Sequence, residues 1–248
     1  SRRQAEGFDE FRKASEVNQH RPWSLFSEIE LLRSSPFVIE SRLKNLASEL
    51  NALILSTVTG TRSLTRSRYT LAELSTTLDS PDLTLELLET INLDQLTDSQ
   101  RNKAYLFKGN ALLALGRTSE AEDILILALS SEQDTREKVI VSLMKVFAIT
   151  DRPEKVIDFA IANPMALTNP SSRDLFNAVL SQTLEDNLLI ELMNRHTTGF
   201  GALSLRLEHA ERLQHKGLIK EAMDFLSRMK NEWPQYRESS WLVLPNYR

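Results

Sequence analysis

The chain has no cysteine, few glycines and prolines, no long apolar run and no excess of positive charge. Without cysteine it forms no disulfide, and cysteine-ligated zinc or iron–sulfur sites and cysteine nucleophiles are excluded. Cysteine-free chains suit the cytosol and the periplasm alike, so composition leaves the compartment open, together with any tether outside this sequence. No apolar run approaches the roughly 18 residues that a membrane span needs, so we predict no transmembrane segment.

Seven glycines and eight prolines in 248 residues provide few turns. An all-β fold needs a turn about every 8–12 residues, so the composition argues against that class. Leu, Ala, Glu, Ser, Arg and Lys dominate, which is typical of helices. The formal net charge of −4 gives no general attraction to nucleic acid or to an anionic membrane. We therefore predict an all-α protein for which nucleic acid is not the expected partner.

The sequence carries no motif that would indicate catalysis or cofactor binding. It contains no G-x-S-x-G, no P-loop and no G-x-G-x-x-G. None of its histidines belongs to an H-E-x-x-H arrangement, and the two that share a predicted helix lie six residues apart and face differently. The histidines are His20, His196, His209 and His215. We predict no catalytic residue, no cofactor and no metal site, and expect that the protein is not an enzyme.

The stretch GNALLALGRTSEAEDILILAL, residues 109–129, reads as two amphipathic helices separated by a short pause. Gly116 lies where the first helix would end in a left-handed residue. Thr118 is predicted to cap the second helix. Before the first helix, Thr97 and Gln100 match a capping box. The pattern predicts a tight helical hairpin over about 98–130.

The same pause recurs along the chain at nearly constant spacing. Turn signals fall at positions 79, 116, 151, 186 and 217, which are separated by 37, 35, 35 and 31 residues. A period close to 34 indicates a repeat architecture. Pro81 and Pro153 suit the first turn of a helix, and Ser171 is expected to start another. We predict five helical hairpins over roughly 65–232.

Two of these units resemble tetratricopeptide repeats (TPRs), in the small residues that let helices cross closely and in the glycine of the turn. One repeat supplies Gly109, Leu112, Gly116, Ala121 and Ala128, and the last repeat supplies Ala210, Leu213, Gly217, Ala222 and Pro234. Other units depart from the pattern. Met144 and Val179 replace the small crossing residue, and Thr84 and Val156 replace the expected alanine. The resemblance implies a right-handed solenoid of about five TPR-like hairpins.

The first 60 residues lack this period and are predicted to form an N-terminal helical cap region. Apolar residues in its longest helix, 37–53, follow coiled-coil spacing for about two heptads. This helix is expected to pack on the first repeat, and the alternative is a homodimer through the same helix. Residues 56–70, STVTGTRSLTRSRYT, read as a loop because serine and threonine compete for backbone hydrogen bonds. The repeats would then occupy residues 61–236, followed by an aromatic tail over 237–248.

The predicted 56–70 loop gathers three arginines among hydroxyl groups. Arg62, Arg66 and Arg68 are candidates for an anion or nucleic-acid contact, and the alternative is a solvated loop. At the other end, aromatic residues near the C-terminus are expected to cover the last repeat or, alternatively, to contact a partner. These are Trp233, Tyr236, Trp241 and Tyr247.

The TPR resemblance implies a partner-binding groove lined by the first helix of each hairpin. Its register assigns to the groove Lys103, Leu106, Asn110, Leu113, Lys138, Val141, Lys145, Arg173, Phe176, Leu180, Leu207, Glu211 and Gln214. A basic and partly apolar groove suits an extended, acidic segment of another protein. Leu106 stands where the chaperone-binding members of the family need lysine, so recognition of a chaperone tail is not predicted.

The expected function is that of a non-catalytic protein–protein interaction scaffold or adaptor, as in bacterial envelope, secretion or polysaccharide-export assemblies. One alternative is an accessory subunit that activates or localises a partner enzyme. The other alternative is nucleic-acid or anion binding through Arg62–Arg68.

Overall fold

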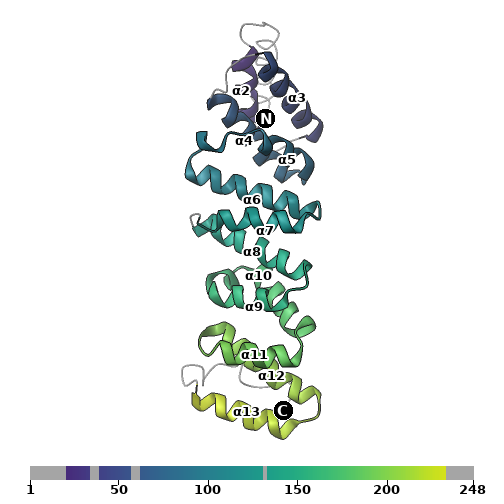
Figure 1. Ribbon diagram of the computed structural model, residues 1–248, viewed down its shortest axis with the longest axis vertical. Helices are drawn as coiled ribbons and strands as arrows, with labels where there is room; N and C mark the ends of the chain where they lie inside the picture. Colours follow the sequence, from purple (N-terminus) through teal and green to yellow (C-terminus); the bar gives the residue numbers. More distant parts are fainter. Residues whose placement is uncertain (1–20, 34–38, 57–61, 131–132, 233–248) are drawn as a thin grey trace, which may run out of the picture. The chain divides into compact units, whose positions relative to one another are not determined.

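The computed structural model describes residues 21–33, 39–56, 62–130 and 133–232, and this part is all-helical (Figure 1). The chain divides into two compact units, residues 1–142 and 143–248, and each is described by itself. The α-helices are α2 (Arg21–Arg33), α3 (Glu40–Ser56), α4 (Arg62–Thr77), α5 (Pro81–Glu89), α6 (Asp98–Ala114), α7 (Thr118–Leu127), α8 (Gln133–Ile149), α9 (Pro153–Ala162), α10 (Pro170–Ala178), α11 (Asp186–Arg195), α12 (Gly199–His215) and α13 (Ile219–Glu232). Short 3₁₀ segments cover Leu93–Gln95, Ala128–Ser130 and Pro164–Thr168, and a π-helix covers Val179–Thr183.

Ten of these helices form the five predicted hairpins, which confirms the all-α repeat architecture. The pairs are α4–α5, α6–α7, α8–α9, α10–α11 and α12–α13. Helices α2 and α3 precede the first pair and contact α4. Pro81 and Pro153 occupy the first turn of α5 and α9, as predicted. The predicted capping box of α6, formed by Thr97 and Gln100, is also present.

Four hairpin turns share one backbone conformation. Asp79, Gly116, Asp151 and Gly217 have φ values of 52°, 76°, 53° and 77°. In each turn the next residue donates its N–H to the carbonyl five positions earlier, as Arg117 does to Leu112 at 2.9 Å. This is the Schellman ending of a helix, which requires a left-handed residue. Aspartate tolerates that conformation better than most residues, so the turn persists where glycine is missing.

The remaining turn is built differently. After α10 the chain enters the π-helix, and Leu184 then donates its N–H to the carbonyl of Val179 at 3.1 Å. Two predicted caps also differ from the structure. Arg117 rather than Thr118 stands at the N-cap of α7, and the side chain of Asn169 rather than that of Ser171 caps α10. In both cases the helix begins one or two residues earlier than the capping signal placed it.

The small residue of the resemblance marks a close helix crossing in the first unit. A Cβ atom on Gly109 of α6 would lie 2.5 Å from Cγ of Leu125 on α7, and Leu125 is fully buried. In the second unit, a Cβ atom on Gly201 of α12 would lie 2.4 Å from Cγ1 of Ile161 on α9. Thr84, which replaces alanine in α5, is buried because its hydroxyl pairs with that of Ser75 at 2.7 Å. The departures from the pattern are therefore accommodated inside the hairpins.

The expectation of a loop over residues 56–70 is wrong, because α4 begins at Arg62. Apolar side chains at helical spacing, including Leu64 and Leu71, are buried in the core of the first unit. One of the hydroxyl groups that suggested a loop, that of Thr65, instead donates a hydrogen bond to Oε1 of Gln95 at 2.6 Å. Burial of one helix face therefore outweighs the weak helix propensity of serine and threonine.

Helix α3 buries three leucines of its coiled-coil stripe inside its own chain, whereas Ile39, the stripe residue just before the helix, is 65% exposed. Leu43, Leu46 and Leu50 are buried in the same cluster as Leu25 and Ile29 of α2. These leucines are consequently not available for the homodimer that their spacing allowed as an alternative. The predicted aromatic tail lies outside the described residues.

Candidate functional site

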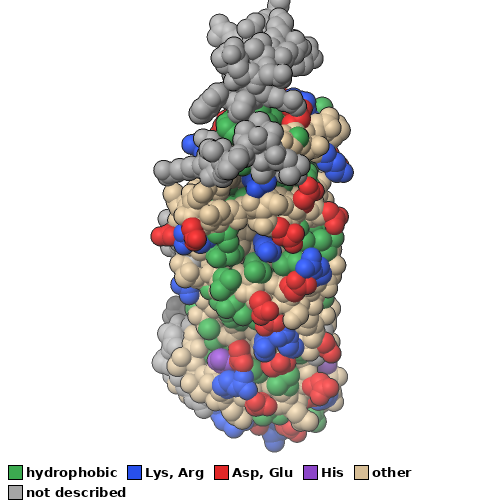
Figure 2. Space-filling view, turned by 45° about the horizontal axis from the view of Figure 1, so that its top comes forward, with side chains coloured by type: hydrophobic (Ala, Val, Ile, Leu, Met, Phe, Trp, Pro, Cys, Tyr) green, Lys and Arg blue, Asp and Glu red, His purple; other side chains and the backbone are tan. Residues whose placement is uncertain are grey.

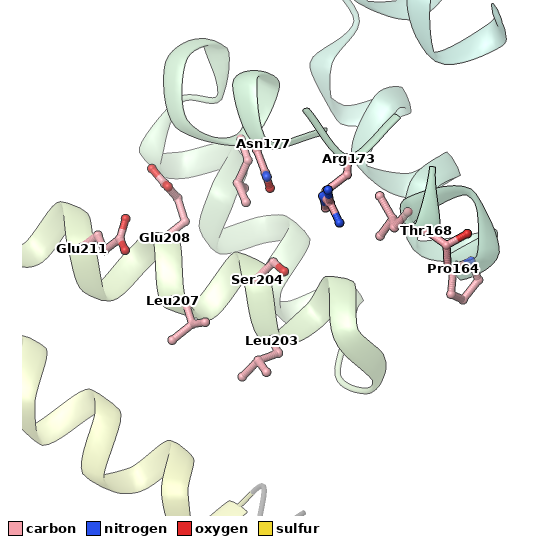
Figure 3. Close-up of a pocket in the computed structure, with 11 residues that line it drawn as sticks. Pro164, Thr168, Arg173, Asn177, Leu203, Ser204, Leu207, Glu208 and Glu211 are labelled. Carbon is pink, nitrogen blue, oxygen red and sulfur yellow. The ribbon is translucent and has the colours of Figure 1, made fainter. Parts of the chain in front are cut away.

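A pocket with a volume of about 560 Å³ opens in the second unit, and we take it as the candidate site (Figure 3). Pockets of this size suit a small ligand or a few side chains of a peptide. It is formed by α10 with the following π-helix, the 3₁₀ segment Pro164–Thr168, and α12. Its lining residues are Pro164, Leu167, Thr168, Arg173, Asn177, Leu180, Leu203, Ser204, Leu207, Glu208 and Glu211.

Helical periodicity explains why these positions share one cavity. The five α12 residues in the lining fall at steps of one and three, which places them on one face of the helix. Arg173, Asn177 and Leu180 follow at steps of four and three along the neighbouring element. Leucines form the inner wall, and three of them are buried: Leu167, Leu180 and Leu203.

The basic and the acidic side chains of the pocket lie on different helices, the basic one on α10 and the acidic ones on α12. Arg173 is exposed, and Figure 3 shows its guanidinium directed into the pocket. Among the described residues this guanidinium has no ion pair and no hydrogen-bond partner. Glu208 and Glu211 lie on α12, and Figure 3 shows Glu211 at the left, away from Arg173, which lies right of centre. The pocket therefore has a basic end and an acidic end, with apolar wall between them.

The two glutamates differ in what compensates their charge. Glu208 is largely buried, with 12% of its side chain exposed, and accepts a hydrogen bond from Nε of Arg212 at 2.7 Å. Glu211 has no such ion pair among the described residues. Burial raises the pKa of Glu211, and the nearby negative charge of Glu208 raises it further, whereas His215 acts in the opposite direction. Glu211 is thus the acidic group of the pocket whose charge is least compensated.

Arg212 fixes the geometry at this end of the pocket. Its Nη2 donates to the carbonyl of Leu180 at 2.6 Å, and its Nη1 donates to the carbonyl of Leu184 at 2.6 Å. These bonds satisfy backbone groups in and after the π-helix, whose wider turn leaves carbonyls without regular α-helical partners. A further bond to Asp186 Oδ1 at 3.0 Å completes the arrangement. Arg212 thereby positions Leu180, a residue of the pocket wall, relative to α12.

Of the groove residues expected from the sequence, Arg173, Leu180, Leu207 and Glu211 line this pocket. Leu106 and Phe176 are buried, with 4% and 1% of their surface exposed, and pack between helices instead of facing solvent. Gln214 is half-buried on α12 and Lys145 is exposed on α8. The members that lie in the first unit and reach its surface are Lys103, Asn110, Leu113, Lys138 and Val141. That these residues form one partner-binding surface stays a prediction.

Two members in the first unit already have partners within the chain. Asn110 accepts a hydrogen bond from the hydroxyl of Ser142 at 2.6 Å. Lys138 pairs with Asp134 at 3.2 Å, one turn earlier on the same exposed helix face. Exposed pairs of this kind contribute little to stability, so they leave the lysine accessible to a stronger partner.

The arginines assigned to an anion contact lie on α4. Arg66 pairs with Glu30 at 3.0 Å, and Arg68 donates to the carbonyl of Thr90 at 2.5 Å. The side chain of Arg62 lies outside the described residues. On the face shown in Figure 2, the Lys and Arg side chains of the described residues are interspersed with Asp and Glu. The loop on which the nucleic-acid alternative depended is absent, and two of its three arginines make contacts within the chain.

Several residues that line the pocket were not assigned to any site by the sequence analysis, above all Asn177, Leu203, Ser204 and Glu208. A signal existed for two of them, because Asn177 follows Arg173 by four residues and Glu208 precedes Glu211 by three. The 3₁₀ segment that closes the pocket carried no comparable signal. Within the described ranges no His, Asp and Glu side chains group as metal ligands. The helices described there include none long and apolar enough to cross a bilayer.

No family model matches the chain, and no curated protein matches it. Two crystal structures of nearly identical TPR-like repeats, from a candidate kinesin light chain of Podosopora anserina, are similar to it. Each has 16% sequence identity and a TM-score of 0.42, covering 88% of this chain and 97% or 98% of the other. Similarity at this level is too low to indicate what this chain binds.

Proposed function

We propose that this protein is a non-catalytic interaction module that binds an extended segment of a partner protein in the pocket between α10 and α12. The observation that carries the proposal is the guanidinium of Arg173, which faces an apolar wall and has no partner among the described residues. Arginine in such a position favours a carboxylate, which it binds through two parallel hydrogen bonds.

The shape of the site supports a peptide more than a reacting small molecule. The pocket is an open depression on helix faces, and its most buried acid, Glu208, is already bonded to Arg212. Leucines on rigid helices offer a preformed apolar surface, which lowers the entropic cost of ordering a flexible segment. Paired helices of this kind, in the TPR-like pattern of the sequence, generally present such surfaces to other proteins.

The wider setting of this activity is part of the proposal. The predicted groove residues Lys103 and Lys138 of the first unit, and Lys145 of the second, are proposed as further basic contacts for a partner, each within its own unit. Assemblies of the bacterial envelope, of secretion or of polysaccharide export are the proposed context, and an accessory role beside a partner enzyme is the alternative.

Photo-crosslinking tests the proposed function at the pocket itself. A benzoylphenylalanine replaces Thr168, an exposed residue of the 3₁₀ segment that lines the pocket, and a second version carries it at Ile190, an exposed position of α11 that does not line the pocket. We expect an adduct with a partner protein from position 168 only, and its loss when Arg173→Glu is added. Adducts that form equally at both positions, or that survive Arg173→Glu unchanged, would place binding elsewhere.

A further inference from the structure

We propose that the pocket recognises a segment with a fixed order of charges: an acidic side chain beside Arg173, an apolar side chain on the leucine wall, and a basic side chain beside Glu211. This inference rests on the proposed function and deepens it, because it names the class of peptide. It differs from the acidic segment that the register of the whole groove predicts, since it requires a cation at a defined position.

The acidic position of the segment follows from the surroundings of Arg173. Its side chain is the only Lys or Arg among the residues that line the pocket. Asn177, one helical turn further along α10, offers an amide that can donate a hydrogen bond to the same carboxylate. A carboxylate bound here would satisfy a guanidinium that now faces the cavity (Figure 3).

The apolar position follows from the composition of the wall. Leu167, Leu180 and Leu203 present the inner surface, and half-buried Leu207 continues it along α12. Covering this wall removes apolar area from water, which stabilises the complex without adding directional bonds. One aliphatic or aromatic side chain of the segment would lie there.

The basic position follows from the imbalance between the two glutamates. Glu208 forms an ion pair with Arg212. Glu211, in contrast, is half-buried, and His215 is the one nearby group whose charge favours the charged form of its carboxyl. A lysine or arginine of the segment would compensate Glu211 and would be repelled from the opposite end by Arg173. Charges arranged in this way determine which way a segment lies in the pocket.

The helix geometry sets the expected spacing. Ser204 is the labelled residue of α12 that is drawn nearest Arg173 in Figure 3, and it precedes Glu211 by seven residues. At 1.5 Å per residue this corresponds to about 10 Å along the helix. An extended segment advances about 3.3 Å per residue, so about three residues span the same length. We therefore expect the acidic and basic residues of a ligand to lie about three to four positions apart, with the apolar residue between them.

Selection from a phage library of random twelve-residue peptides, with the full chain as bait, tests this order. The wild-type chain should enrich peptides with an acid and a base at the stated spacing and in one order. Arg173→Glu should replace the acidic preference with a basic one, and Glu211→Lys should replace the basic preference with an acidic one. The matched controls are Lys220→Glu and Glu221→Lys, two exposed changes on α13 outside the pocket, which should select the same peptides as wild type.

The outcomes separate this inference from the proposed function. Asn177→Trp, which fills the pocket from an exposed position, should abolish enrichment in every case. If peptides are enriched and Asn177→Trp removes them, but neither charge change alters their sequence, the charge order is wrong and the proposed function stands. If no peptide is enriched, or Asn177→Trp has no effect, both are overturned. Should a charge reversal prevent folding, Arg173→Gln and Glu211→Gln are used, and each should weaken a selected peptide about tenfold.

Discussion

Leu125 of α7 occupies the space that a side chain on Gly109 of α6 would need, since a Cβ there would lie 2.5 Å from Leu125 Cγ. Leu125 is fully buried and cannot move aside without disturbing its neighbours. The two helices of this hairpin are therefore in register at one point that tolerates no added methyl group. The most TPR-like unit of the chain depends on this contact.

Gly109→Ala should lower the free energy of unfolding by about 1–2 kcal/mol, because overpacking outweighs the gain of about 1 kcal/mol in helix propensity. In a Leu125→Ala background the same change should become stabilising, since the space is then open and only the propensity gain remains. Chemical denaturation of the four chains measures this cycle. A destabilising effect of equal size in both backgrounds would contradict the proposed contact.

Gly116→Val should destabilise the protein by about 1–2 kcal/mol, and Gly116→Asp by less. A side chain at this turn would meet no atom within 4 Å, so the cost comes from the backbone φ of 76° alone. Asp79 and Asp151 already adopt this conformation at the equivalent turns. Thermal unfolding should rank the three chains as glycine, aspartate and valine, and equal stability of the two variants would exclude a backbone origin.

Arg212→Lys should destabilise the second unit by about 2 kcal/mol although it retains the charge. Lysine cannot reach both the carbonyl of Leu180 and that of Leu184, so a backbone acceptor at the π-helix loses its donor. We expect a selected peptide to bind more weakly to this variant, because Leu180 belongs to the pocket wall. Arg195→Lys, at an exposed arginine of α11 that does not line the pocket, is the control, and an equal loss of peptide affinity in both variants would remove the positioning role of Arg212.

Glu211→Gln should raise the melting temperature at pH 7 and raise it less at pH 4. The pKa of Glu211 is higher in the folded protein than in the unfolded chain, so folding favours its neutral form. Stability from this group is therefore greatest below the unfolded pKa and is lost as the pH rises through the folded pKa. The groups whose charge acts on it are Glu208 and His215, both on α12. Glu221→Gln on α13 serves as the exposed control, and a gain that does not depend on pH would contradict this account.

The architecture could be predicted because its signals are local. Each turn needs one left-handed residue, and the constant spacing of these residues exposed the repeat before any helix was placed. The start of helix α4 was missed because its serines and threonines suggest a loop, whereas the contacts that favour the helix are long-range, such as Thr65 with Gln95 and the burial of Leu64 and Leu71.

The pocket could be predicted only in part, for a related reason. The helical register gave Arg173 on α10, Leu180 directly after it, and Leu207 and Glu211 on α12. It could not give the wall formed by the 3₁₀ segment Pro164–Thr168, because that segment leaves the 3.6-residue period. The burial of Leu106 and Phe176 likewise depends on how closely neighbouring helices pack, which the register alone does not determine.

The most direct test of the central claim is a charge-exchange measurement between Arg173 and a peptide selected on the wild-type chain. Calorimetry would compare wild type and Arg173→Glu, each with the selected peptide and with a version whose acidic residue is replaced by lysine. We predict that Arg173→Glu binds the original peptide with an affinity at least tenfold lower than that of wild type. The same variant should bind the lysine version of the peptide with restored affinity. If Arg173→Glu binds the original peptide as tightly as wild type does, this pocket is not the binding site.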